Sequence, residues 1–297
     1  MIVERVHTFG DDRGLVGVVT SPASPRAGAP AVVLLNAGLV HRVGPFRMHV
    51  ELARRLAGAG FLVLRMDQSS LGDSQARPAG LSYEERAVLD ARQAFDFLTE
   101  RYGTPRFVVV GLCAGAMNAH RVALADDRVV GCCLLDGYAY RTKGFWIRRA
   151  ASAALDPRAW RGLAARLARG VKQGSLLHVL DRSEGDWSAP SGESPGEDAT
   201  SIFAQDWPPL SEVRGELERI VARGVRMLYV YTGGWSDFTH PSQFDEMFPD
   251  LPARSVDVRY FPEADHTYVI LAHREKMLRE VEAFLLRVAS SDERRGA

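Results

Sequence analysis

Cys113 has the sequence surroundings of a reactive thiol. Residues 107–112 form an apolar run with three consecutive valines and predict a buried strand, whereas residues 116–124 predict a helix. Cys113 lies at the sharp turn between them, next to Gly111 and Gly115, the small residues that a strained backbone requires on either side. We therefore expect its side chain above the carboxyl edge of a sheet, at the positive end of a helix. There a thiolate could act as a nucleophile. The alternative interpretation is a buried structural cysteine beside a packing glycine.

The run Gly111-Leu-Cys113-Ala-Gly115 resembles the G-x-S-x-G nucleophile elbow of the α/β-hydrolase superfamily, with cysteine in place of serine. The resemblance implies a nucleophile, an acid and a histidine in that chain order. Asp237 follows the penultimate expected strand and His266 follows the last, so they match the acid and the histidine. Asp136 is the alternative acid, because some members of the family carry the carboxylate one strand earlier.

The resemblance also implies a role for each of these residues. Cys113 would attack as a thiolate, His266 would take and return the proton, and Asp237 would fix the tautomer of the histidine. Backbone N–H groups of Leu39 and Ala114 would form the oxyanion hole. In the loop that holds Leu39, Ala37-Gly38 stands where the family usually carries a histidine-glycine pair.

Other polar and aromatic residues are weaker candidates. His41 lies near the expected oxyanion loop, Trp146 lies in a segment rich in tryptophan and arginine, and Trp235 precedes Asp237, so we take these three as candidate substrate contacts. For each of them the plainer alternative is an ordinary surface or packing residue. Asp67 is interpreted as structural, and Cys132 and Cys133 as small hydrophobic core residues.

Strands alternate with helices along the chain, which predicts a mostly parallel, doubly wound sheet of the α/β-hydrolase type. Residues 2–20 alternate in polarity and predict an antiparallel hairpin at the sheet edge. A change of composition predicts an inserted helical lid with a flexible loop over residues 138–207. This insertion divides the core domain into residues 1–137 and 208–297.

Composition narrows the class of protein. The 297 residues carry 37 basic and 37 acidic side chains, so the molecule offers no overall field for nucleic acid. The apolar runs have the length of strands, and the N-terminus lacks the pattern of a signal peptide, so we expect no membrane span. Three cysteines without metal-type spacing predict a reduced, cytoplasmic protein with no metal and no cofactor.

These features favour a cysteine-dependent acyl hydrolase or thioesterase. A cysteine nucleophile forms a thioester intermediate, and dienelactone hydrolases show that this elbow also cleaves esters. We expect an acyl ester or acyl thioester substrate, free or carrier-bound. One alternative is an acyltransferase or acyl-eliminating lyase of a biosynthetic pathway, and another is a non-catalytic ligand-binding or partner protein of the same fold. Over the first half of the chain the sequence also resembles hydrolases associated with exosortase systems.

Overall fold

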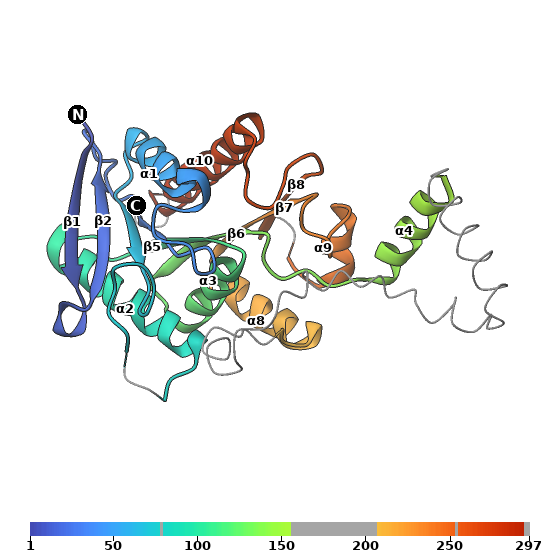
Figure 1. Ribbon diagram of the computed structural model, residues 1–297, viewed down its shortest axis with the longest axis horizontal. Helices are drawn as coiled ribbons and strands as arrows, with labels where there is room; N and C mark the ends of the chain where they lie inside the picture. The colour runs from blue at the N-terminus through green and yellow to red at the C-terminus, as the bar shows by residue number, and fades with distance from the viewer. Residues whose placement is uncertain (78–79, 156–206, 253–254, 294–297) are drawn as a thin grey trace, which may run out of the picture. The chain divides into compact units, whose positions relative to one another are not determined.

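The computed structural model describes residues 1–77, 80–155, 207–252 and 255–293. Within these ranges the strands form one sheet in the order β1-β2-β4-β3-β5-β6-β7-β8 (Figure 1). β1 and β2 are antiparallel, as are β2 and β4, and every other neighbouring pair is parallel. The strands are β1 (Val3–Phe9), β2 (Leu15–Ser21), β3 (Ala31–Leu34), β4 (Val63–Asp67), β5 (Phe107–Leu112), β6 (Val129–Leu135), β7 (Arg226–Thr232) and β8 (Val256–Phe261). The predicted fold class, a mostly parallel α/β-hydrolase sheet, is confirmed.

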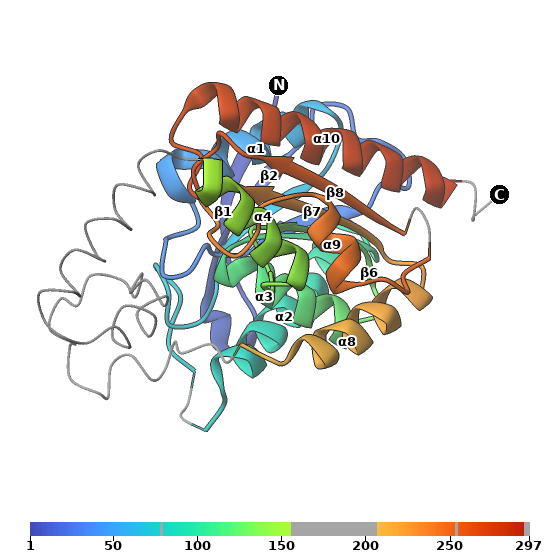
Figure 2. The same cartoon turned by 90° about the vertical axis from the view of Figure 1, so that its right-hand side faces the viewer.

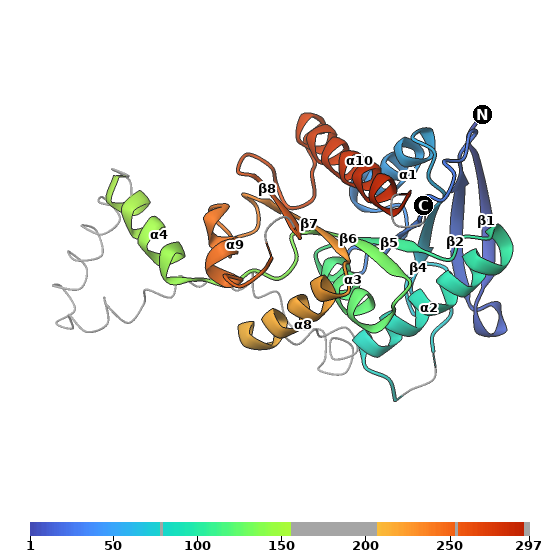
Figure 3. The ribbon, with the colours of Figure 1, turned by 180° about the vertical axis from the view of Figure 1, so that it is seen from behind.

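The N-terminal hairpin forms one edge of this sheet. Phe9 pairs with Leu15 across a short 3-10 turn, η1 (Asp11–Arg13), as the alternating pattern of residues 2–20 predicted. Figure 3 shows β1 and β2 at one end of the sheet and β7 and β8 at the other. The parallel strands between these edges bring their carboxyl ends together, which is where an α/β sheet usually carries its functional site.

Helices cover both faces of the sheet (Figure 2). The described helices are α1 (Met48–Gly58), α2 (Tyr83–Tyr102), α3 (Ala114–Ala125), α4 (Lys143–Leu155), α8 (Leu210–Ala222), α9 (Ser242–Met247) and α10 (Leu271–Glu293), with a 3-10 turn η2 (Pro45–Arg47) before α1. α2, α3 and α8 pack on one face, and α1 and α10 pack on the other. α2 begins with a capping box, because Ser82 and Glu85 bond each other's backbone amides.

The two hydrophobic layers hold the central strands in place. On one face the rings of Phe95 and Phe107 stack with their centroids 4.1 Å apart, and on the other Leu56 and Phe284 are fully or almost fully buried. Each such side chain contributes roughly 1.5–3 kcal/mol through burial. Because the central parallel strands are buried on both sides, the loops at their carboxyl ends start from fixed positions.

The chain divides into two compact units, residues 1–140 with 205–297, and residues 141–204. The first contains the sheet, and the second contains α4. Most of the lid expected over residues 138–207, including its loop, lies outside the described residues. Among the described helices, none is both long enough and apolar enough to cross a bilayer.

Candidate active site

Cys113 lies at the bend between β5 and α3. Its backbone has φ 57° and ψ −124°, and it caps the N-terminus of α3. A positive φ costs a residue with a Cβ roughly 1–3 kcal/mol, so the surroundings must enforce the bend. A Cβ at Gly111 would overlap the backbone of Gly115, and a Cβ at Gly115 would overlap the carbonyl of Asn36. The two glycines are therefore required by close backbone contacts, and the half-buried Cys113 side chain stands at the positive end of α3.

The elbow is joined to the end of β6, where Asp136 is fully buried. The amide of Cys113 donates to the carbonyl of Leu135 over 2.9 Å. Asp136 accepts hydrogen bonds of 2.7 Å from both the amide and the hydroxyl of Thr232, the last residue of β7. Buried carboxylates need such donors to remain ionised, so Thr232 both holds and stabilises Asp136.

His266 completes this group from the loop after β8. Its Nδ1 lies 2.8 Å from Oδ2 of Asp136, although the two residues are 130 positions apart in the chain. Burial lowers the pKa of His266, but hydrogen bonds and negative charge from Asp136 and Cys113 outweigh it and raise the pKa to about 10. The imidazole is therefore protonated at neutral pH. A protonated imidazole beside a cysteine favours the thiolate form of that cysteine.

The carboxylate at His266 is that of Asp136, the alternative acid, and not that of Asp237, which we had expected first. Asp237 lies five residues beyond β7, where its carbonyl oxygen accepts a hydrogen bond from Gln243. Asp136 comes directly after β6. Its backbone amide donates to the carbonyl of Val230 over 2.8 Å and so extends the hydrogen bonding between β6 and β7 by one residue. That pairing brings Asp136 to the edge that His266 reaches, so Asp136 is the carboxylate carried into the proposal below.

The expected oxyanion donors lie in two segments that contact each other. Residues 37–40 form a turn in which the amide of Val40 donates to the carbonyl of Ala37, and Gly38 has φ 56°. In a turn of this kind the amides of the two central residues, here Gly38 and Leu39, are not used by the turn itself. Ala114 is the first residue of α3. Because Gly115 packs directly on Asn36, this turn and the start of α3 are neighbours.

The sequence model of the alpha/beta hydrolase family matches residues 12–281, which is most of the chain. The chain belongs to this family. Esterase EstD of Thermotoga maritima is 30% identical over 114 residues, which cover 37% of this chain and only 27% of that esterase. The chain therefore matches about a quarter of the length of this relative.

Solved structures of other α/β-hydrolases share the fold along nearly the whole chain. A proline iminopeptidase of Mycobacterium smegmatis has a TM-score of 0.57 at 18% identity, with 97% of this chain and 99% of that chain covered. An esterase of Pyrococcus furiosus has a TM-score of 0.57 at 16% identity, with 97% and 90% covered. The α/β-hydrolase GrgF of a Penicillium species has a TM-score of 0.59 at 14% identity, with 98% and 99% covered. At these identities the likeness shows the fold alone.

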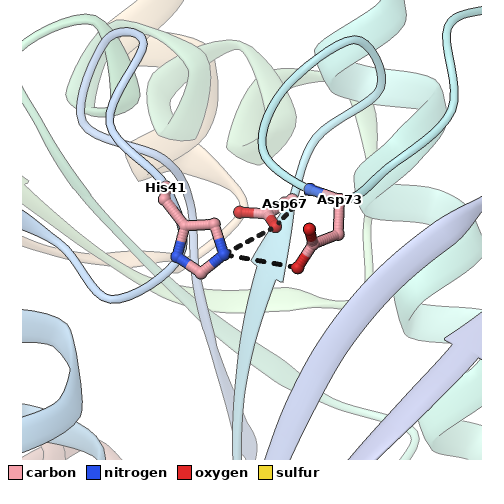
Figure 4. A group of neighbouring side chains, drawn as sticks. All are labelled: His41, Asp67 and Asp73. Atoms are coloured by element: carbon pink, nitrogen blue, oxygen red, sulfur yellow. Dashed lines mark hydrogen bonds and ion pairs between the residues drawn. The ribbon is translucent and has the colours of Figure 1, made fainter.

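In this protein a network of charged groups connects the loop after β3 with the loop after β4 (Figure 4). Asp67, fully buried at the end of β4, accepts hydrogen bonds from the backbone amide and the guanidinium of Arg42 and from Asn36. The same guanidinium donates to Asp73 over 2.7 Å and lies 2.7 Å from Nε2 of His41. No motif in the sequence marks Arg42, which was not among the candidate residues; its place in the loop that carries Leu39 was the one hint.

The guanidinium of Arg42 also decides how the cluster of His41, Asp67 and Asp73 is best interpreted. Their ligand-type atoms lie within 4.8 Å of one another, which is close enough for a metal ion. However, Arg42 already donates to both carboxylates and supplies the positive charge that a cation would bring. We therefore assign the cluster as an ion-pair network that joins the loop after β3 to the loop after β4. It places His41, a candidate substrate contact, against Asp73 and Arg42.

The remaining sequence candidates lie in different surroundings. The ring of Trp235 stacks on the imidazole of His266, whereas Trp146 lies on α4 in the second unit and is 51% exposed. Cys132 and Cys133 are completely buried within β6, and burial raises the pKa of both thiols. Cys113 is therefore the cysteine whose surroundings suit chemistry.

Proposed function

We propose that this hydrolase cleaves acyl ester or acyl thioester bonds through a covalent acyl-cysteine intermediate, with Cys113 as nucleophile, His266 as proton carrier and Asp136 as the acid. The observation that carries the proposal is the double contact of His266. Its Nδ1 bonds the buried carboxylate of Asp136, and the Cys113 side chain at the elbow raises the pKa of the same ring. A nucleophile, a base and an orienting carboxylate connected in this way are the elements of a catalytic triad.

The first half of the proposed reaction acylates the enzyme. The thiolate sulfur of Cys113 attacks the substrate carbonyl carbon, a C–S bond forms, and the carbonyl electron pair moves to the oxygen. The amides of Leu39 and Ala114 donate to this oxyanion. When the tetrahedral intermediate collapses, the bond to the leaving group breaks and Nε2 of His266 gives its proton to the departing alcohol or thiol.

The second half regenerates the enzyme. The imidazole, now neutral, takes a proton from a water molecule whose oxygen attacks the thioester carbonyl. Collapse of this second intermediate breaks the C–S bond, releases the carboxylic acid and returns the electron pair to Cys113. His266 is again an imidazolium, which Asp136 stabilises throughout without taking the proton itself.

Two further observations support this reading. The family is one of hydrolases, and the structurally similar proteins include esterases and a peptidase. In addition, the pKa of His266 is raised to about 10, so its imidazolium can give a proton to the leaving group as the proposed reaction requires. The narrower resemblance to exosortase-associated hydrolases and a carrier-bound substrate remain predictions.

Trapping of the acyl-enzyme tests the proposal. Purified protein is mixed with a panel of activated acyl esters and acyl thioesters, and intact mass is recorded before and after peptide mapping. We expect a mass increase equal to the acyl group, located on Cys113 and absent from the variant Cys113→Ala. If no substrate of the panel acylates Cys113, the covalent mechanism is wrong.

Product analysis of the same mixtures decides the fate of the acyl group. Free acid indicates hydrolysis, an acyl group on a second substrate indicates transfer, and a new double bond indicates elimination. A protein that binds these compounds with unchanged products and no adduct would be a non-catalytic member of the fold.

A further inference from the structure

The loop after β7 packs against the loop that carries His266. The amide of Gly233 donates to the carbonyl of Phe261 over 3.0 Å, and that of Gly234 donates to Ala264 over 3.1 Å. A Cβ at Gly233 would overlap the carbonyl of Pro262, and a Cβ at Gly234 would lie 2.5 Å from the amide nitrogen of His266. The two glycines allow an approach that no larger residue permits, and the next residue along the chain is Trp235.

Trp235 places its indole on the imidazole of His266. The ring centroids are 4.9 Å apart and the planes are inclined by only 19°, which is a stacked arrangement. The backbone of Trp235 is held in place, because its amide donates to Thr232 and its carbonyl accepts from Phe238, each over 3.1 Å. Thr232 is also the residue that holds Asp136, so one short segment fixes both the carboxylate and the stacked ring.

The stack adds in two ways to what the hydrogen bond to Asp136 does. The hydrogen bond restrains the imidazole at one atom, whereas a flat neighbour restricts the plane of the whole ring. An aromatic face also attracts a positive charge, so it favours the imidazolium over the neutral ring. The other charged or titratable neighbours are Cys113 from the elbow and Asp136 from β6.

Two more carboxylates lie on the adjoining loops. Asp265 precedes His266, but its oxygens accept from the backbone amides of Thr267 and Val269. Asp237 follows Trp235 on the loop after β7. Neither carboxylate supplies the flat surface that the indole provides.

We propose that Trp235 is a positioning residue that acts through His266: its indole holds the imidazole plane toward Cys113 and stabilises the thiolate–imidazolium pair. This inference rests on the proposed function only for the catalytic use of that pair. The structural basis, a ring stacked on the histidine beside a half-buried thiol, stands on the geometry.

The titration of Cys113 tests this role without any substrate. The rate of alkylation by iodoacetamide is measured from pH 4 to 10 in the parent protein and in the variants Trp235→Leu, Trp235→Phe and Trp207→Leu. Cys113→Ala serves as the blank for Cys132 and Cys133. Trp207 is the matched control, because it belongs to the same aromatic group: the centroid of its ring lies 6.3 Å from that of Trp235.

We expect Trp235→Leu to raise the midpoint of thiolate formation by about half a pH unit or more, which lowers the alkylation rate below that midpoint about threefold or more. Trp235→Phe keeps an aromatic face, so its midpoint should lie close to that of the parent protein. Trp207→Leu should leave the midpoint unchanged. A Leu variant with an unchanged thermal midpoint of unfolding that titrates like the parent protein would overturn the role. Absence of an acyl adduct at Cys113 together with the expected shift would instead overturn the proposed function alone.

Discussion

At the scale of single residues, the site depends on which carboxylate is buried beside the histidine. Asp136 is completely buried and receives three hydrogen bonds, two from Thr232 and one from His266. Such bonds to an ionised group are worth about 1.5–3 kcal/mol each, so they hold both the charge and the position of the carboxylate. Asp237 is half-buried in a surface turn. Residue type alone does not distinguish these two aspartates, but their partners do.

Replacement of the two aspartates by asparagine gives a matched pair of variants. Asp136→Asn places an amide at Nδ1 of His266, which can no longer hold the imidazolium, and kcat/KM should fall on the order of 10³–10⁴-fold. Asp237→Asn should change kcat/KM by less than about threefold, as is usual for a residue that carries no step of the chemistry. Initial rates on the substrate that acylates Cys113 provide the measurement. Equal losses in both variants would contradict the assignment of Asp136.

At the scale of elements, the site is formed by segments that follow β3, β4, β5, β6, β7 and β8. The elbow after β5 meets the turn after β3 where Gly115 packs on Asn36, and the loop after β7 meets the loop after β8 at Gly233 and Gly234. Backbone contacts this close transmit small displacements from one loop to the next, because interiors are packed without spare volume.

Gly115→Ala tests the contact between elbow and turn. The added methyl group would overlap the carbonyl of Asn36, so the two segments must separate and the proposed oxyanion donors of Leu39 and Ala114 move apart. We expect kcat to fall about 10²-fold, as when one oxyanion donor is lost. Gly58→Ala is the control, since a Cβ there meets nothing within 4 Å and alanine suits the helix better. A fully active Gly115→Ala enzyme would show that the turn takes no part in catalysis.

Arg42→Met tests the network between the loops after β3 and β4. The substitution keeps most of the apolar stem of the side chain but leaves the buried carboxylate of Asp67 without the guanidinium. The free energy of unfolding should fall by about 2–3 kcal/mol, as for loss of a hydrogen bond to a charged group. Urea denaturation measures this change. The exposed Arg47, in the same segment, provides the control Arg47→Met, which should shift the free energy of unfolding by no more than about 0.5 kcal/mol.

At the scale of the whole molecule, folding itself creates the charge state of the site. The pKa of His266 is 6.5 in the unfolded chain and rises to about 10 in the folded protein, because folding brings Asp136 and Cys113 to the ring. Between these two values the folded state binds more protons at this residue than the unfolded state does. Proton binding at His266 therefore favours folding.

Stability should consequently depend on pH through His266. Its contribution is fully present below pH 6.5 and is lost as the pH rises to about 10. The measurement is the free energy of unfolding in urea at several pH values from 6 to 10, for the parent protein and for His266→Gln. We expect the difference between the two proteins to be largest at pH 6 and to shrink steadily. A difference that stays constant across this range would mean that His266 is not protonated in the folded state.

The sequence by itself determined the local parts of this protein: the alternation of strands and helices, the elbow with Cys113 and its two glycines, and the loop that carries His266. These features depend on residues a few positions apart, so backbone sterics and the periodicity of apolar side chains are enough to reveal them. Only the tertiary structure decided that Asp136 holds His266, that Arg42 joins two loops and that Trp235 stacks on the imidazole. Each of these contacts joins segments brought together by strand order, which no local pattern records.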